Sequence, residues 1–203
     1  MHLLLLEFHI STSLAFSLAQ AAIAAVWILQ YGSARKTRGY SEGRQAIAKD
    51  DRFKTFGKVI FAVNNLVTLA SFWTNSKLLL LFWQEDLFRL AGVVVLVAAT
   101  LLCIKSMRDL GANYSPCFDS HRPLRIVTKG TYRYVRHPLY LANILQGLGY
   151  VIVSSSLWVL LLSGFGIFKI VSALVKEESY LTKTFPGYEK YQSRTSRLIP
   201  FVY

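Results

Sequence analysis

The sequence predicts an all-α integral membrane protein with about five transmembrane helices, a C-terminal helical hairpin and a cytoplasmic helical tail. The first observation behind this fold class is composition. Of the 203 residues, 53% are hydrophobic and 17% are charged, whereas soluble domains average about 45–50% apolar and about 25% charged residues. The second observation is a series of long apolar stretches. The third is the alternation of basic and nearly neutral segments between them, which is typical of multi-pass membrane proteins.

Five apolar stretches approach the length of about 20 residues that a helix needs to cross a hydrocarbon core of about 30 Å. The first stretch is uncharged, the third contains Arg89 and Lys105, and the fifth contains Lys169. The leading residues have no basic segment and no small-residue cleavage site, so we expect them to belong to the mature chain. We expect transmembrane helices at 10–31, 56–73, 87–107, 138–153 and 156–175.

The charges of the connecting segments predict the orientation in the membrane. Segments 32–55, 108–137 and 176–203 are rich in Lys and Arg, whereas 74–86 and 154–156 carry little net charge. Because cytoplasmic loops are enriched in basic residues, we expect the N-terminus outside and the C-terminus in the cytoplasm. Topology then explains the formal net charge of +12. Nucleic-acid binding, the other common reason for a strongly basic chain, loses its main support, and we expect no nucleic-acid partner.

A basic stretch, "KGTYRYVRHPLYLAN" (129–143), lies directly before and into the fourth apolar stretch. Proline is favoured in the first turn of a helix, where its missing N–H would be unpaired anyway. Pro138 therefore predicts a helix start, with His137 at its N-terminal end. The free N–H groups and the partial positive charge of this end favour an anionic ligand group. Tyr140 follows one turn later and can face the same polar pocket.

Glu177 and Glu178 lie just beyond the fifth apolar stretch. Because a helix C-terminus disfavours negative charge, carboxylates there indicate either a ligand with positive charge or hydroxyl donors, or basic partners within the protein. The link between the fourth and fifth stretches is short enough to require an antiparallel hairpin. The outer ends of the hairpin then meet at one surface, which brings His137 and Glu177 together. The basic partners that could satisfy the glutamates instead are Arg133, Arg136 and Lys176.

Four motifs in the C-terminal half form a pattern: "IVTKGTYRYVRHPLY" (126–140), "KEESYL" (176–181), "FPGYEKY" (185–191) and "RLIP" (197–200). Together they resemble the isoprenylcysteine carboxyl methyltransferase family. The members of this family are integral membrane enzymes that use S-adenosylmethionine and are similar to the phospholipid N-methyltransferases. The resemblance implies two regions. An N-terminal three-span membrane region occupies 1–107, and a methyltransferase core of cofactor-binding loop, hairpin and cytoplasmic tail occupies 108–203.

The resemblance also implies a cofactor site. His137 and Tyr140 would hold the amino-acid end of S-adenosylmethionine, and Glu177 its amino group or ribose. One position departs from the family pattern, because Leu124 stands where a histidine is frequent. The implied cofactor-binding residues are Leu124, Arg125, Ile126, Val127, Tyr132, His137, Pro138, Leu139, Tyr140 and Glu177.

A second departure concerns the acceptor. The carboxyl methyltransferases place an arginine for the substrate carboxylate one turn before the glutamate, and this chain has Ala173 there. Lys169 lies one further turn back on roughly the same helix face. A charged side chain inside a membrane span is a functional candidate by default. Lys169 and Arg136 are therefore the candidate substrate-contacting residues.

The chemistry of methyl transfer suits a site without a metal or a nucleophile. A sulfonium methyl group is already activated, so transfer depends on positioning and on exclusion of water. A carboxylate acceptor is ionised at neutral pH and needs no base. An amine acceptor must first lose a proton, and the candidate catalytic groups for that step are His137, Tyr140 and Glu178. We expect a lipophilic acceptor, either a carboxylate such as a prenylcysteine or a lipid amine, that enters from the bilayer.

Two other functions stay open. NADPH-dependent membrane reductases of sterol-like lipids have a similar "RHPxY" and "YxxY" pattern, although they are usually longer. A non-enzymatic membrane scaffold would use the hairpin motifs for structure alone. The chain has no Rossmann fingerprint, and Cys103 and Cys117 are not spaced as a metal-binding pair, so we expect no metal. The sequence leaves the oligomeric state open.

Overall fold

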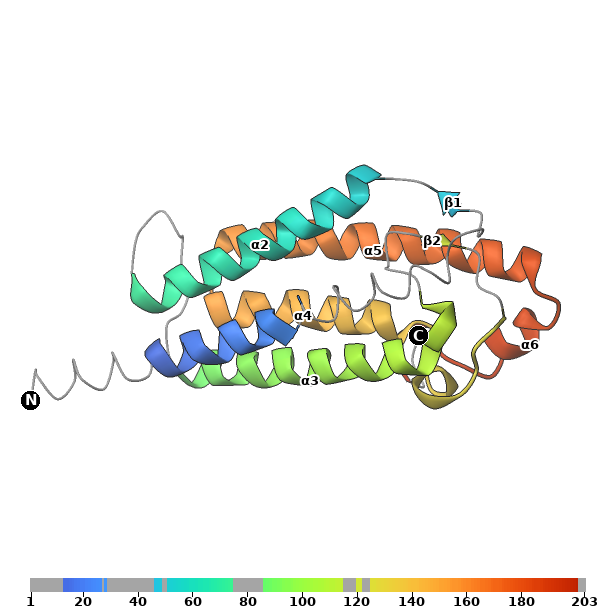
Figure 1. Cartoon of the computed structure of the whole chain (residues 1–203), viewed down its shortest axis with the longest axis horizontal. Helices are drawn as coiled ribbons and strands as arrows, with labels where there is room; N and C mark the ends of the chain where they lie inside the picture. The colour runs from blue at the N-terminus through green and yellow to red at the C-terminus, as the bar shows by residue number, and fades with distance from the viewer. Residues whose placement is uncertain are drawn as a thin grey trace, which may run out of the picture.

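The computed structural model describes residues 13–26, 28, 46–48, 51–74, 86–114, 120–121 and 125–200. Long helices dominate and run side by side (Figure 1). The N-terminal helix is Ser13–Val26. It is followed by β1 (Ala46–Ala48), α2 (Asp51–Trp73), α3 (Asp86–Leu110), the 3-10 helix η3 (Gly111–Asn113), β2 (Ser120–His121), the 3-10 helix η4 (Gly130–Arg133), α4 (Pro138–Ser154), α5 (Leu157–Thr184) and α6 (Tyr188–Gln192).

The helical class predicted from the sequence is confirmed for every long element. The expected starts of the fourth and fifth helices agree with the structure to within one residue. One short feature was not expected, an antiparallel pairing of β1 with β2 in which Ala46 lies opposite His121. This pairing ties the segment before α2 to the segment after α3.

Helix α5 is longer than its apolar pattern predicts. The apolar stretch ends at Val175, whereas the helix continues to Thr184. The added residues include Lys, Glu and Leu, which are good helix formers in water as well as in lipid. An apolar pattern identifies the part of a helix that faces lipid and therefore misses such a polar extension.

Helices α3 and α4 approach closely because each of them has a glycine at the position where it contacts the other. A Cβ atom on Gly149 would lie 2.7 Å from Cγ of Leu96, and one on Gly92 would lie 2.7 Å from the backbone nitrogen of Val153. Helix α4 also packs against α5 and α2 and is thus the central helix of the bundle. Leu96 and Val153 belong to a buried apolar cluster that also contains Phe72 and Tyr150.

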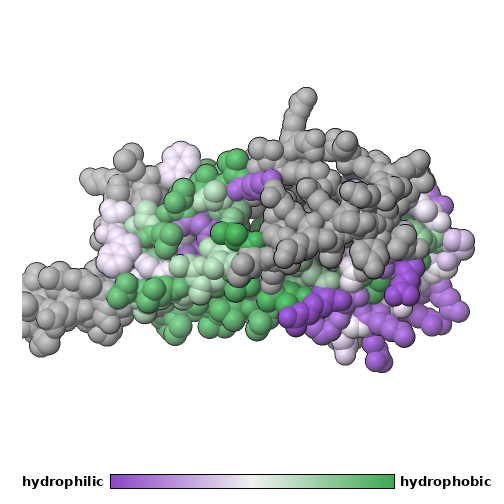
Figure 2. Space-filling model, in the orientation of Figure 1, coloured by the Kyte–Doolittle hydropathy of each residue, from purple (hydrophilic) through white to green (hydrophobic). Residues whose placement is uncertain are grey.

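The outer surface of the bundle is apolar. Along α3, exposed apolar side chains recur every three or four residues and form one stripe: Leu87, Leu90, Val94, Val97 and Leu101. Figure 2 shows a wide hydrophobic band over the helices and a hydrophilic end beside it. A continuous exposed apolar face of this size is unsuited to water and suited to lipid.

Among the described residues, α3 and α5 are long and apolar enough to cross a membrane, and the N-terminal helix and α4 are shorter apolar helices. Together with the exposed apolar surface, these helices indicate a membrane protein. The count of five spans and the outside–inside orientation stay predictions.

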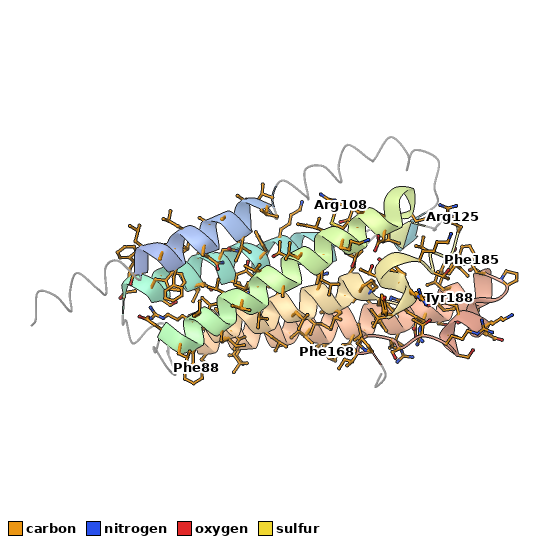
Figure 3. The ribbon with its side chains drawn as sticks, turned by 90° about the horizontal axis from the view of Figure 1, so that it is seen from below. Phe88, Arg108, Arg125, Phe168, Phe185 and Tyr188 are labelled. Atoms are coloured by element: carbon orange, nitrogen blue, oxygen red, sulfur yellow. The ribbon has the colours of Figure 1, made fainter. Side chains whose placement is uncertain are left out.

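The hairpin predicted between α4 and α5 is confirmed. Only Ser155 and Ser156 separate the two helices, and Ser155 adopts a left-handed conformation with φ of 52° that reverses the chain. The start of α4, the end of α5, and α6 therefore lie at one end of the molecule (Figure 1). Figure 3 shows Arg125 and Tyr188 at this end and Phe88 at the opposite one.

Candidate active site

The loop before α4 lies at the polar end of the bundle and is held there by hydrogen bonds to α3. At the end of α3, Asp109 accepts hydrogen bonds from the backbone nitrogen (2.8 Å) and the hydroxyl (3.0 Å) of Thr131. Lys105 pairs with the same carboxylate from one helical turn earlier. Gly130 has φ of +65°, and a Cβ atom there would collide with the carboxylate of Asp109. The loop therefore needs glycine at this position for both its conformation and its anchor.

The C-terminal segment pairs with this loop and completes it. The backbone nitrogen of Arg136 donates to the carbonyl of Ser196 (2.9 Å), and that of His137 donates to the carbonyl of Arg197 (3.2 Å). Farther back in the loop, the carbonyl of Tyr132 accepts a hydrogen bond from the Tyr191 hydroxyl at 2.5 Å. Helix α6, through Tyr191, and the segment 196–197 therefore both hold the residues just before α4.

Glu178 is the centre of a buried ion-pair network. Nε of Arg136 donates to one carboxylate oxygen and Nε of Arg197 to the other, both at 2.7 Å. Nε2 of His137 lies 3.2 Å from the first oxygen. The Glu178 side chain is only 5% exposed and that of Arg136 only 9%. Because both oxygens carry cationic donors, Glu178 is held as a carboxylate that joins α5, the loop and the tail.

Arg136 extends this network into the backbone of the tail. Its terminal nitrogen donates to the carbonyl of Gln192 at 3.0 Å and also to that of Thr195. The structure shows the internal pairing with a glutamate that was considered for Arg136 from the sequence, and substrate contact by Arg136 stays a prediction.

Glu177 has different surroundings. Its Oε2 accepts a hydrogen bond of 2.6 Å from the hydroxyl of Tyr140, and the residue is half-buried. The ring of Tyr140 lies 5.5 Å from that of His137, centroid to centroid. The expected meeting of the two hairpin ends is confirmed by these contacts. We call the group of His137, Tyr140, Glu177 and Glu178 the polar mouth.

Two tyrosines of the tail lie beside the polar mouth. Burial and the nearby charge of Glu178 raise the pKa of Tyr188. Burial also raises the pKa of Tyr191. Both phenols therefore stay protonated near neutral pH, so that Tyr191 remains a donor to the loop.

The other residues implied for the cofactor site have varied positions. Arg125 is exposed, and its backbone nitrogen donates to the side chain of Asn113, while Ile126 and Val127 are half-buried. Tyr132 and Pro138 are buried. The structure brings these residues to the same end of the molecule, and Leu124 lies outside the described residues.

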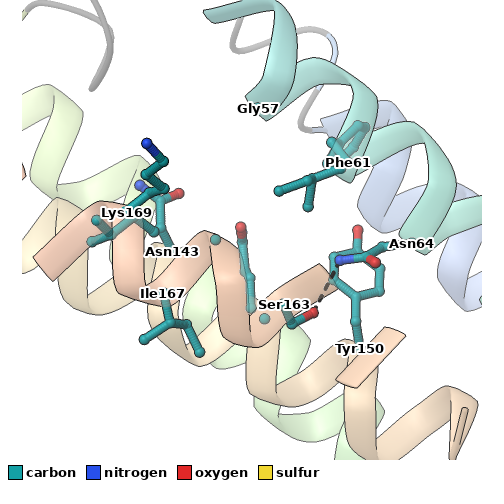
Figure 4. A pocket seen from close by; sticks show the side chains of 13 residues that line it. Gly57, Phe61, Asn64, Asn143, Tyr150, Ser163, Ile167 and Lys169 are labelled. Atoms are coloured by element: carbon teal, nitrogen blue, oxygen red, sulfur yellow. Dashed lines mark hydrogen bonds between the residues drawn. The ribbon is translucent and has the colours of Figure 1, made fainter. Parts of the chain in front are cut away.

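Two of the predicted residues are described by contacts outside the polar mouth. Leu139 packs with Cys103 and Ala142 in an apolar cluster between α3 and α4. Lys169 lies two helical turns before Glu177 and lines a cavity between α2, α4 and α5 (Figure 4).

Sequence reasoning missed three residues that hold this site. Arg197 begins the "RLIP" motif, and that motif is the one signal that could have identified it. Asp109 and Tyr191 act across 22 and 59 positions of the chain, respectively. Tyr191 ends the "FPGYEKY" motif, which marks the residue but not its partner, and no local pattern marks the contact of Asp109. Within the described ranges, no three His, Cys, Asp or Glu side chains gather as a metal site requires.

Comparison with known proteins identifies a family that matches this part of the chain. Residues 87–187 match the family model described as phospholipid methyltransferase. The matched region runs from the first turn of α3 to the residue before α6 and contains the whole polar mouth. No curated protein matches the chain.

Proposed function

The chain belongs to the phospholipid methyltransferase family, and from this membership we propose that it transfers a methyl group from S-adenosylmethionine to a lipophilic acceptor held in the membrane. The family match supports methyl transfer by a membrane enzyme. The observation that carries the proposal is the position of the polar mouth, which lies inside the matched region at the end of two apolar helices.

The residues of the polar mouth fit the polar groups of S-adenosylmethionine. Glu177 offers a half-buried carboxylate that suits an amino group or ribose hydroxyls. His137 and Tyr140 offer ring and hydroxyl groups beside it. The loop residues 125–127, the buried Tyr132, Pro138 and the start of α4 would complete the pocket. When bound, the cofactor supplies a methyl group that is already activated, so these residues need only orient it and exclude water.

The ion pairs of Glu178 redefine its role in the proposal. A base must be able to accept a proton, and a carboxylate that accepts hydrogen bonds from two arginines resists protonation. We therefore assign Glu178 to the positioning of His137 and of the tail. Where the acceptor is an amine, its proton can pass to His137, or to the Tyr140 hydroxyl while that hydroxyl passes its own proton to the Glu177 carboxylate. Where it is a carboxylate, no base is needed.

The reductase alternative gains nothing from the family match, because the matched family transfers methyl groups. The same match counts against a scaffold without activity, because the matched family transfers methyl groups. These observations favour methyl transfer over both alternatives.

The test is binding and transfer with purified protein in non-ionic detergent. We expect S-adenosylhomocysteine to bind, NADPH not to bind, and label from methyl-labelled S-adenosylmethionine to enter one species of a native lipid extract. His137→Ala and Glu177→Ala should weaken S-adenosylhomocysteine binding at least about tenfold, which corresponds to about 1.4 kcal/mol. Lys183→Met, a change at an exposed site beyond the polar mouth, is the control.

Two results would overturn the proposal. One is NADPH binding in the absence of S-adenosylhomocysteine binding, which would point to a reductase. The other is unchanged S-adenosylhomocysteine binding in folded His137→Ala and Glu177→Ala proteins, which would place the cofactor elsewhere.

A further inference from the structure

The exposed side of α3 changes from apolar to basic towards the polar end of the bundle. Its apolar stripe advances by three or four residues at a time and ends with Leu101, which is 61% exposed. Lys105 and Arg108 follow at the same spacing and are also exposed. Residues three or four apart lie on the same side of a helix. The two cations therefore continue the side of α3 that is suited to lipid, and Figure 2 shows hydrophilic side chains directly beside the hydrophobic band.

The loop before α4 adds a third cation at the same place. Lys105 pairs with Asp109, and a Cβ atom on Gly130 would collide with the same carboxylate. Lys129 directly precedes Gly130 and is exposed, while Arg108 directly precedes Asp109. Lys105, Arg108 and Lys129 are therefore neighbours at the end of α3, and we call them the basic cluster.

The basic cluster has a surplus of positive charge. Its three cations stand against the single carboxylate of Asp109, which leaves a formal charge of +2. Hydrogen bonds from Lys105 and Thr131 lower the pKa of Asp109, so this carboxylate stays ionised and engaged. Within the described residues, neither Arg108 nor Lys129 forms an ion pair. The cluster can therefore accept an anionic partner without breaking an ion pair of these two residues.

The position of the basic cluster selects the kind of anion. Lys105 lies one turn beyond Leu101 on the lipid-suited side of α3, and Arg108 lies nearly one turn farther on. Long basic side chains can lie along apolar surface and carry their charge to the level of the lipid headgroups. Basic residues immediately beyond a membrane helix attract anionic lipids. A phospholipid with a net negative headgroup matches both parts, because its acyl chains suit the stripe and its phosphate suits the cluster.

We propose that the basic cluster binds the headgroup phosphate of a phospholipid with net negative charge, whose acyl chains lie along the apolar stripe of α3. This lipid is distinct from the methyl acceptor, because the polar mouth is built from α4 and α5. The proposed lipid site therefore does not depend on the proposed function. At the other end of the stripe, Leu87 follows the acidic Asp86, and we expect no preference for anionic lipid there.

A tryptophan placed in the stripe reports which lipid lies next to it. Leu101→Trp puts the reporter one turn from Lys105, and Leu87→Trp puts it at the opposite end of α3. Each protein is reconstituted in phosphatidylcholine vesicles that contain brominated phosphatidylglycerol or brominated phosphatidylcholine as quencher. The quenching of the wild-type protein, which has four tryptophans of its own, is subtracted. We expect phosphatidylglycerol to be preferred at Leu101→Trp by at least about fivefold, the effect of one basic residue near an anionic surface, and not to be preferred at Leu87→Trp.

Neutralising the basic cluster should remove this preference. In the Leu101→Trp protein, Arg108→Gln together with Lys129→Gln lowers the formal charge of the cluster from +2 to 0, and we expect the preference to be lost. Arg108→Lys together with Lys129→Arg keeps the charge and should keep the preference. Lys183→Gln together with Lys190→Gln removes the same charge from exposed sites of α5 and α6 and should have no effect. Because all four sites are exposed, we expect each of these proteins to fold.

Three results would overturn the proposed site. The first is equal quenching by the two lipids at Leu101→Trp, or a preference there that survives the neutralisation of Arg108 and Lys129. The second is the same preference at Leu87→Trp, which would show a general attraction and no local site. The third is loss of the preference in excess inorganic phosphate but not in chloride of equal ionic strength, which would identify a site for a soluble anion.

The proposed function is decided separately in the same vesicles. We expect S-adenosylhomocysteine to bind equally to the wild-type protein and to the protein with Arg108→Gln and Lys129→Gln. Its failure to bind the wild-type protein would overturn the proposed function, while the quenching measurements would still decide the lipid site.

Discussion

At the scale of single residues, adjacent glutamates have opposite surroundings. Glu178 is buried between two arginines, whereas Glu177 is half-buried with a tyrosine donor. Removing one partner of a buried ion pair costs about 3–5 kcal/mol, because the remaining charges stay buried without compensation. We expect Glu178→Gln to lower the thermal unfolding temperature strongly. Glu177→Gln should cost about 1 kcal/mol, and it should weaken binding of S-adenosylhomocysteine.

The two variants control each other, since they differ by one position on the same helix. Thermal unfolding in detergent measures the first effect and cofactor binding the second. A Glu178→Gln protein as stable as the wild type would show that the network in the tail is not formed in solution.

At the scale of elements, the contact of α3 with α4 depends on glycine. A methyl group at Gly149 would lie 2.7 Å from the side chain and 3.3 Å from the backbone of Leu96, so the helices would have to separate. Overpacking of this kind costs about 1–3 kcal/mol. We expect Gly149→Ala to lower the unfolding temperature. Gly164→Ala, where the methyl group meets open space, should leave it unchanged or raise it, and equal effects of both changes would contradict the close contact.

The elements also show which features a sequence can reveal. Pro138 and the apolar pattern predict the start of α4, and the short serine link predicts the hairpin, because each depends on neighbouring residues. The anchors Asp109 and Arg197 depend on side chains that meet only after the helices pack. The cavity has the same origin, since Asn64 and Ser163 are 99 positions apart. Local patterns therefore predicted the helices, the meeting of the hairpin ends and Arg136 as a candidate partner of the glutamates, but not the anchors Asp109 and Arg197.

At the scale of the whole molecule, the predicted orientation places the polar mouth in the cytoplasm. In a protein with Cys103 and Cys117 replaced by alanine, we expect Thr74→Cys to react with a membrane-impermeant maleimide on intact cells. Ser193→Cys, at an exposed site of the tail, should react only after lysis, because the two positions lie on opposite sides in a five-span arrangement. Labelling of both positions on intact cells would contradict this topology.

The apolar stripe of α3 has a consequence for how the protein reaches its fold. Leu87, Val94 and Leu101 are exposed. In a bilayer such side chains would contact lipid both before and after an inserted helix associates with its neighbours, so the stripe would contribute almost nothing to assembly there. Association must rely on the opposite face, where glycine contacts and interhelical hydrogen bonds lie. We infer that insertion and assembly draw on separate sets of residues. Sequence change along the stripe can then be extensive without loosening the bundle.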